Sequence, residues 1–215
     1  MLKAVLFDMD GLIFDSESIY KQSWQFAALE QGLSISDDFY QQFIGVQDPE
    51  CEQQLVDYFQ SAIDIHRYRS IRDQYYHNLR SHGIPLKPGF EPLLTAIKQR
   101  DLLTAIVTSS QRSDVEYNFR TSNYLLAQFD LIISAEDVTL GKPNPDCYKM
   151  AYRQLRVDAK QCLVLEDSNN GIRAALAAEC HAVMIPDLLP PLRELKSKIT
   201  VLNQLDEVIP LLDNM

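Results

Sequence analysis

Residues 4–11 have the sequence Ala-Val-Leu-Phe-Asp-Met-Asp-Gly, and this stretch indicates the fold more clearly than any other in the chain. Four apolar residues in a row are typical of a strand that is covered on both faces, as in a parallel sheet. Asp8 follows directly, and an ionised carboxylate in that place needs a cation or a strong hydrogen-bond partner. Taken alone, Asp10-Gly11 is equally typical of a simple turn. The stretch therefore predicts a buried strand that ends in either a turn or a reactive site.

Similar apolar runs recur along the chain, with helical patterns between them. The expected strands are residues 4–7, 102–107, 131–134, 162–165 and 182–185. The expected helices between them are residues 89–100, 113–123, 145–155 and 170–179. Strands that alternate with helices in this way favour a doubly wound α/β fold built on a parallel sheet.

The interval between the first two expected strands is too long for a simple crossover. It contains about 95 residues, whereas a crossover with one helix needs about a dozen. Helical patterns lie at 16–31, 49–61 and 63–81, and the first begins with Ser16 as its N-cap. Such a long insertion predicts a separate, all-helical cap module. We expect the α/β catalytic core at residues 1–15 and 88–215 and the cap at residues 16–87.

The composition excludes several classes of partner. The 215 residues include 30 acidic and 20 basic ones, and the resulting charge of −10 repels nucleic acid and anionic membranes. The four cysteines form no CxxC pair, so we expect buried, reduced thiols and no zinc site. The chain begins without a signal-peptide pattern and has no apolar run of the roughly 20 residues that cross a membrane. We expect a cytoplasmic protein that is a monomer, with a dimer as the alternative.

Polar groups suited to phosphate chemistry stand at the ends of several expected strands. Parallel strands end at one edge of a sheet, so these groups are expected to meet there. Asp8 would attack phosphorus, and Asp10 would give a proton to the leaving oxygen and later take one from water. Thr108 and Ser109 would hold phosphate oxygens, and Lys142 would supply a fixed positive charge. The alternatives are helix capping by the two hydroxyl residues and an ordinary solvated lysine.

A second acidic pair, Glu166-Asp167, follows the fourth expected strand. By itself it could be the acidic first turn of the helix that comes next. Together with Asp8 and Asp10 it would bring four acids to one edge of the sheet, where a cation is needed to offset their charge. Oxygen ligands favour magnesium. We therefore predict a Mg²⁺ site formed by Asp8, Asp10, Glu166 and Asp167.

These segments resemble, in order, the four motifs of the haloacid dehalogenase superfamily. The matching segments are residues 8–16 (Asp-Met-Asp-Gly-Leu-Ile-Phe-Asp-Ser), Thr108, Lys142 in Gly-Lys-Pro-Asn-Pro-Asp, and Glu166-Asp167-Ser168 followed by Gly171. The resemblance extends from residue 1 to about residue 185. It implies a Rossmann-like core and a helical cap inserted after the first motif. It also implies Mg²⁺ held by Asp8, the Asp10 carbonyl and Asp167, with Glu166 close by.

The acid at position 10 bears on the type of reaction. In this family, members that act on carbon–halogen or carbon–phosphorus bonds lack an acid at the position of Asp10. The resemblance therefore implies hydrolysis of a phosphate ester or transfer of phosphate between sugar hydroxyls. A phospho-receiver signalling domain is a remote alternative, because receivers carry the phosphorylated aspartate after the third strand rather than the first.

The chain is similar to the β-phosphoglucomutase-like subgroup, but two cap features differ from true mutases. Tyr20 stands where those enzymes carry a histidine, and Gln47 and Asp48 stand where they carry an arginine for a second phosphate. Three other arginines could compensate, although they are more typical of an exposed basic helix face: Arg67, Arg69 and Arg72. We predict a phosphatase for a small phosphorylated metabolite, a sugar phosphate, with a phosphosugar mutase as the alternative.

Overall fold

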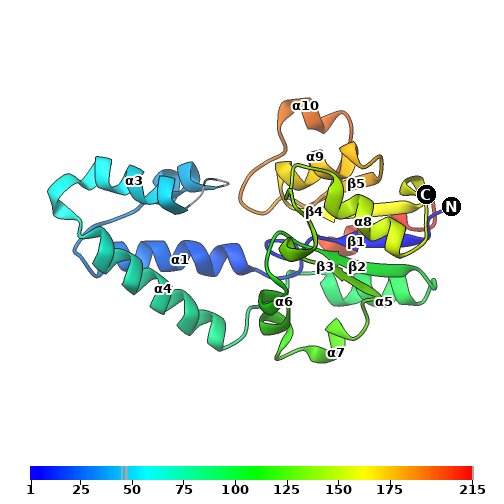
Figure 1. The fold of residues 1–215 in the computed structure, drawn as a ribbon, viewed down its shortest axis with the longest axis horizontal. Coiled ribbons are helices and arrows are strands. Elements are labelled where there is room, and N and C mark those ends of the chain that lie inside the picture. The colour runs from blue at the N-terminus through cyan, green and yellow to red at the C-terminus, as the bar shows by residue number, and fades with distance from the viewer. Residues whose placement is uncertain (45, 47, 215) are drawn as a thin grey trace. The chain divides into compact units, whose positions relative to one another are not determined.

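The computed structural model describes residues 1–44, 46 and 48–214, and these divide into two compact units. An α/β unit joins Met1–Asp15 to Pro85–Met215, and a helical unit consists of Ser16–Ile84 (Figure 1). Each unit is described by itself below.

The strands of the α/β unit form one parallel sheet among the described residues. Their order is β3-β2-β1-β4-β5-β6. The strands are β1 (Ala4–Phe7), β2 (Leu103–Val107), β3 (Leu131–Ile133), β4 (Cys162–Glu166), β5 (His181–Met184) and β6 (Thr200–Val201). The chain leaves β1 for β2 on one side and returns to β4 on the other, so β1 lies at the point where the strand order reverses. This topology confirms the predicted doubly wound, Rossmann-like fold with a helical insertion.

Helices cover both faces of this sheet (Figure 1). They are α5 (Phe90–Lys98), α6 (Arg112–Phe119), α7 (Asn123–Leu126), α8 (Asp146–Gln154), α9 (Asn169–Ala177) and α10 (Arg193–Lys196). Short 3-10 segments lie at Ala135–Asp137, Ala159–Gln161 and Leu205–Leu211. Figure 1 shows α8 and α9 on one side of the sheet and α5 and α6 on the other.

Successive side chains of β1 point to opposite faces of the sheet, so they pack against the helices on either side. Ala4 and Leu6 belong to the core formed with Cys147, Tyr148 and other residues of the α8 and α9 side. Phe7 contributes to an aromatic cluster with Phe90 and Phe129, with ring centroids 6.0 and 5.7 Å from its own. Burial on both faces explains why this strand is apolar at every position.

The α/β unit resumes at Pro85 rather than at residue 88 as expected, because residues 85–87 pair with the segment after β1. The backbone N–H of Asp15 donates to the Pro85 carbonyl at 2.9 Å, and that of Lys87 donates to the Ile13 carbonyl at 2.8 Å. Phe14 and Leu86 form the antiparallel bridge between these two hydrogen bonds.

The helical unit packs around Trp24, which is 1% exposed. Its helices are α1 (Ser16–Leu29), α2 (Asp37–Tyr40), α3 (Asp48–Phe59) and α4 (Ile65–Ser81), with 3-10 turns at Gln41–Phe43 and Gln60–Ala62. Asp64 begins α4 as its N-cap, because its side chain accepts hydrogen bonds from the N–H groups of His66 and Arg67. The Tyr68 hydroxyl donates to the Trp24 carbonyl at 2.7 Å and ties α4 to α1.

The expectation of an exposed basic face on α4 is wrong for Arg72. Its side chain is 5% exposed, and its guanidinium pairs with Asp48 at 3.3 Å and with Glu52 at 3.2 Å. It also lies over the Trp24 ring, 4.6 Å from the ring centroid. Arg69 pairs with Glu52 as well. Arg72 is buried because α3 supplies carboxylates that neutralise it.

Tyr20 of the helical unit donates its hydroxyl hydrogen to Asp48 at 2.5 Å, while Gln47 lies outside the described residues. The four cysteines are buried free thiols, as predicted: Cys51, Cys147, Cys162 and Cys180. Within the described part of the chain, no helix has the length and apolar character that a membrane crossing requires.

Candidate active site

Three neighbouring strands bring the predicted polar residues to one edge of the sheet. In the register, Phe7 of β1 lies level with Ile106 of β2 and with Leu165 of β4. Asp8 therefore emerges beside the last residue of β4, Glu166, and close to Thr108 after β2. The Asp8 N–H still donates to the Leu165 carbonyl at 3.0 Å, which holds its backbone in line with the sheet.

Lys142 lies between two of the predicted acids. Its ammonium donates to Asp8 Oδ1 at 2.6 Å, to Glu166 Oε1 at 2.6 Å and to the Val107 carbonyl at 2.8 Å. The side chains of Lys142, Asp8 and Glu166 are 6%, 11% and 0% exposed. Lys142 is therefore a fixed positive charge at the nucleophile candidate and not a solvated surface lysine.

Both carboxylate oxygens of Glu166 accept hydrogen bonds. Its Oε1 also accepts from the Tyr148 hydroxyl at 2.7 Å, and its Oε2 accepts from the hydroxyl of Ser168 at 2.9 Å and from the Ser168 N–H at 3.2 Å. Gly171 faces this carboxylate, and a Cβ at residue 171 would overlap it. Because both of its oxygens already accept hydrogen bonds, Glu166 is suited to orienting Lys142.

The electrostatics of Asp8 follow from burial and from these neighbours. Burial raises the pKa of the Asp8 carboxyl from 3.8 to about 8; the positive charge of Lys142 opposes the shift, and the negative charge of Glu166 adds to it. Burial alone would lower the pKa of Lys142, but the charges of Asp8 and Glu166 outweigh it and raise that pKa. The raised pKa keeps Lys142 charged at neutral pH.

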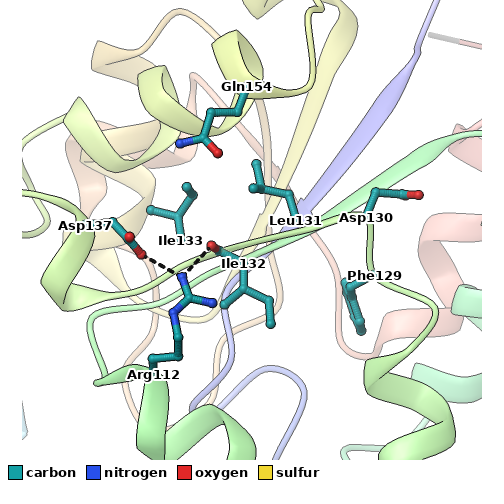
Figure 2. A pocket seen from close by; sticks show the side chains of 8 residues that line it. All are labelled: Arg112, Phe129, Asp130, Leu131, Ile132, Ile133, Asp137 and Gln154. Atoms are coloured by element: carbon teal, nitrogen blue, oxygen red, sulfur yellow. Dashed lines mark hydrogen bonds and ion pairs between the residues drawn. The ribbon is translucent and has the colours of Figure 1, made fainter.

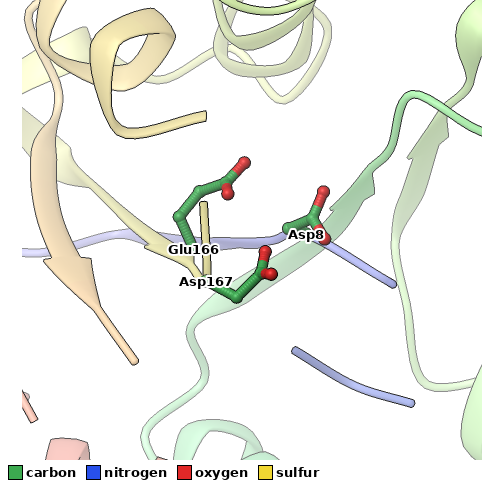
Figure 3. Close-up of side chains that lie close together, drawn as sticks. All are labelled: Asp8, Glu166 and Asp167. Atoms are coloured by element: carbon green, nitrogen blue, oxygen red, sulfur yellow. The ribbon is translucent and has the colours of Figure 1, made fainter. Parts of the chain in front are cut away.

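Asp167 completes an acidic cluster with Asp8 and Glu166 (Figure 3). Each of the three offers a carboxylate oxygen, and these oxygens lie within 4.8 Å of one another. Three buried or half-buried acids beside one lysine leave an excess of negative charge that a divalent cation would offset. The donor set contains only oxygen, and the cluster therefore fits an ion such as Mg²⁺.

Asp10 lies next to Ser110, which stands with Thr108 and Ser109 at the end of β2 but had no predicted role. The Ser110 hydroxyl donates to Asp10 Oδ2 at 2.6 Å, and the Ser110 N–H donates to Thr108 Oγ1 at 3.0 Å. Thr108 is buried and Ser109 is exposed. Ser110 directly follows two predicted residues, but its spacing from Asp10 along the chain carried no signal. Tyr148 was missed because its spacing from its partner, Glu166, carried no signal either.

A hollow of about 360 Å³ lies elsewhere, along the edge strand β3 (Figure 2). Arg112 crosses it and donates to the Ile132 carbonyl at 3.1 Å and to Asp137 at 3.0 Å. The lining residues do not include any member of the acidic cluster, so we assign no chemistry to this hollow. They are Arg112, Phe129, Asp130, Leu131, Ile132, Ile133, Asp137 and Gln154.

A doubly wound sheet with a lysine-bound carboxylate after its first strand and an acidic cluster beside it is the arrangement of an α/β enzyme. Residues 5–185 match the model of the haloacid dehalogenase-like hydrolases, and the chain belongs to that family. The match confirms the predicted family and the predicted class of enzyme, a hydrolase.

Relatives agree with this assignment. A protein of Thermotoga maritima named phosphorylated carbohydrates phosphatase is 25% identical over 177 residues, which cover 82% of each chain. Hexitol phosphatase A of Escherichia coli is 27% identical, over 96% of this chain and 93% of the relative. The crystal structure of a β-phosphoglucomutase from Clostridium difficile has a TM-score of 0.71 over 100% of this chain and 96% of the other. That similarity, at 22% identity, shows a shared fold.

Proposed function

We propose that this chain is a Mg²⁺-dependent phosphatase that hydrolyses a small phosphorylated metabolite, a sugar phosphate, through an aspartyl-phosphate on Asp8. One observation carries the proposal: Asp8 accepts a hydrogen bond from the buried Lys142 and belongs to the acidic cluster, while Asp10, two residues further along the chain, accepts a hydrogen bond from Ser110. The names of the two phosphatase relatives support the substrate class.

In the first step, a carboxylate oxygen of Asp8 attacks phosphorus and forms a bond to it. The bond from phosphorus to the ester oxygen breaks, and Asp10 gives its proton to that leaving oxygen. Lys142 lies at Asp8 Oδ1, so it can stabilise the charge on the phosphoryl oxygens as they approach. The products of this step are the free alcohol and the aspartyl-phosphate.

In the second step, water attacks phosphorus and transfers a proton to Asp10. The bond between phosphorus and the Asp8 oxygen breaks, which releases inorganic phosphate and restores both carboxyl groups to their starting states. The Ser110 hydroxyl donates a hydrogen bond to Asp10 Oδ2, so Oδ1 is the oxygen that carries the proton in both steps. Thr108 and Ser109 are proposed to hold phosphoryl oxygens through their N–H and hydroxyl groups.

The residues proposed to hold the ion are Asp8, Asp167 and the carbonyl of Asp10, with Glu166 adjacent. When bound, Mg²⁺ would neutralise part of the charge of the phosphate and of the carboxylates around it. Glu166 is proposed to act mainly on Lys142, because its oxygens are engaged by Lys142, Tyr148 and Ser168.

Hydrolysis is favoured over the mutase alternative by contacts inside the helical unit. A mutase needs a cation for a second phosphate, and the arginines considered for it are Arg67, Arg69 and Arg72. Arg69 and Arg72 are both paired with Glu52, and Arg72 is also paired with Asp48. Arg67 is exposed and donates to the Glu30 carbonyl at 3.4 Å. A second phosphate bound by Arg69 or Arg72 would have to displace these carboxylates, and a monophosphate substrate would not.

The test is a screen of phosphorylated metabolites in which free phosphate and isomerised sugar phosphate are measured side by side. We expect phosphate release without isomerisation, inhibition by EDTA and recovery with added Mg²⁺. Asp8→Asn should lower kcat at least about 10³-fold with the fold intact, and Asp10→Asn should lower it about 10²–10⁴-fold. An Asp8→Asn protein with near wild-type turnover would refute the nucleophile, and isomerised product would decide for the mutase.

We further propose that the enzyme is cytoplasmic, since the four buried free thiols suit a reducing compartment. We also propose that it is a monomer. Analytical ultracentrifugation of the purified chain tests the monomer against the dimer.

A further inference from the structure

Asp187, three residues beyond β5, has a carboxylate oxygen that nothing in the described chain satisfies. The side chain is 8% exposed. Its Oδ1 accepts from the Lys87 ammonium at 2.7 Å, but its Oδ2 is buried and has no hydrogen-bond partner among the described residues. A buried carboxylate oxygen without a partner is costly and marks a place where a donor is expected.

This oxygen faces Gly11, next to the acidic cluster. Gly11 has a φ of +78°, and the point where its Cβ would stand lies 2.5 Å from Asp167 Oδ2 and 3.2 Å from Asp187 Oδ2. The two carboxylates therefore converge on one point beside the Gly11 backbone. Asp187 is outside the group of Asp8, Glu166 and Asp167, whose oxygens are mutually close enough to share an ion. Asp187 is thus better placed for a water of the ion than for the ion itself.

We propose that Asp187 is a positioning residue of the divalent-cation site, whose Oδ2 accepts a hydrogen bond from a water ligand of the ion. This inference rests on the proposed function, because it requires the ion at Asp8 and Asp167. Mg²⁺ usually keeps several of its waters, and carboxylates behind the direct ligands orient those waters and strengthen binding. The Lys87 ammonium, which is also 3.6 Å from Asp15, binds Oδ1, so Oδ2 is not used by this ion pair.

A purely structural role for Asp187, as the counter-ion of Lys87, predicts a different result and can be separated from this one. In that case, Lys87→Met and Asp187→Asn would break the same ion pair and would change Mg²⁺ binding alike. In the proposed role, only the loss of the Asp187 charge weakens binding. Lys87→Met removes a positive charge near the ion and should leave the affinity unchanged or increase it.

The experiment is calorimetric titration of Mg²⁺ into the metal-free full chain, with thermal unfolding of each protein recorded beside it. We expect Asp187→Asn to weaken Mg²⁺ affinity about tenfold, with Lys87→Met equal to or tighter than wild type. Asp206→Asn is the matched control and should bind as wild type does. Asp206 also has a buried oxygen that lacks a partner within the described part of the chain, and this oxygen packs against a glycine, Gly89. The Lys87→Met/Asp187→Asn double variant removes both charges of this ion pair and should bind as weakly as Asp187→Asn.

Equal affinities of wild type and Asp187→Asn would overturn this inference and leave the proposed function standing. Equal weakening by Lys87→Met and Asp187→Asn would also overturn it, in favour of the structural role. A wild-type protein that does not bind Mg²⁺ would overturn the metal site of the proposed function and this inference with it.

Discussion

The Ser110 hydroxyl donates a hydrogen bond of 2.6 Å to Oδ2 of Asp10, across 100 residues of sequence. Ser110 thereby orients the proposed acid and base. Ser110→Ala should lower kcat about 10–10²-fold with little change in KM, since a hydrogen bond to a charged group contributes about 1.5–3 kcal/mol. Steady-state kinetics on p-nitrophenyl phosphate measures this. Ser113→Ala, an exposed serine on α6, is the control and should behave as wild type; equal rates for both variants would contradict the role.

The Glu166 carboxylate leaves no space for a side chain at residue 171, which is a glycine. A methyl group there would overlap Glu166, which is 0% exposed and cannot retreat without releasing Lys142, Tyr148 or Ser168. Gly171→Ala should destabilise the protein by about 1–3 kcal/mol, and we expect it to lower kcat because Lys142 loses its second partner. Chemical denaturation and kinetics measure the two effects.

The matched control is Gly141→Ala, because an added Cβ at residue 141 meets nothing within 4 Å. It should leave the free energy of unfolding unchanged within about 0.5 kcal/mol. If Gly171→Ala were as stable as Gly141→Ala, Glu166 would be able to move away from the added methyl group, and the prediction would be wrong.

The raised pKa of Asp8 predicts that Mg²⁺ binding depends on pH. With a pKa of about 8 in the metal-free protein, Asp8 is protonated below that pH, and binding must release the proton. The affinity should rise about tenfold per pH unit between roughly pH 6 and pH 8 and then level off. Calorimetry in buffers of different ionisation enthalpy measures both the affinity and the proton released. Flat affinity across this range would show that Asp8 is already charged without the metal.

Arg72 is predicted to stabilise the helical unit. Arg72→Met leaves the buried Glu52 with Arg69 alone and removes the contact with Trp24, so it should lower the free energy of unfolding by about 3 kcal/mol. Arg67→Met on the same helix is the exposed control and should cost less than about 0.5 kcal/mol. Denaturant unfolding of both variants is the measurement, and equal stabilities would refute the prediction.

Much of the fold could be predicted because apolar runs and capping residues are local signals. β1 was predicted at its observed bounds, Ala4–Phe7, and α8 and α9 to within one or two residues at each end. The expected helix at 113–123 is two helices, α6 and α7, separated around Thr121-Ser122. β6, an edge strand of two exposed residues, was missed although it lies within the short apolar run 199–202, because so short a run cannot be told from a loop by its pattern.

The sequence by itself determined the α/β class, the long helical insertion and the acids after the strands, because these depend on order and spacing along the chain. Only the tertiary structure decided the partners of those acids. Contacts of Lys142 with Glu166, of Ser110 with Asp10 and of Asp187 with the Gly11 turn join residues that are far apart in sequence. The same holds for Arg72, whose burial depends on carboxylates supplied by α3. Such contacts are set by how strands and helices pack, and the periodicity of a single segment carries no information about them.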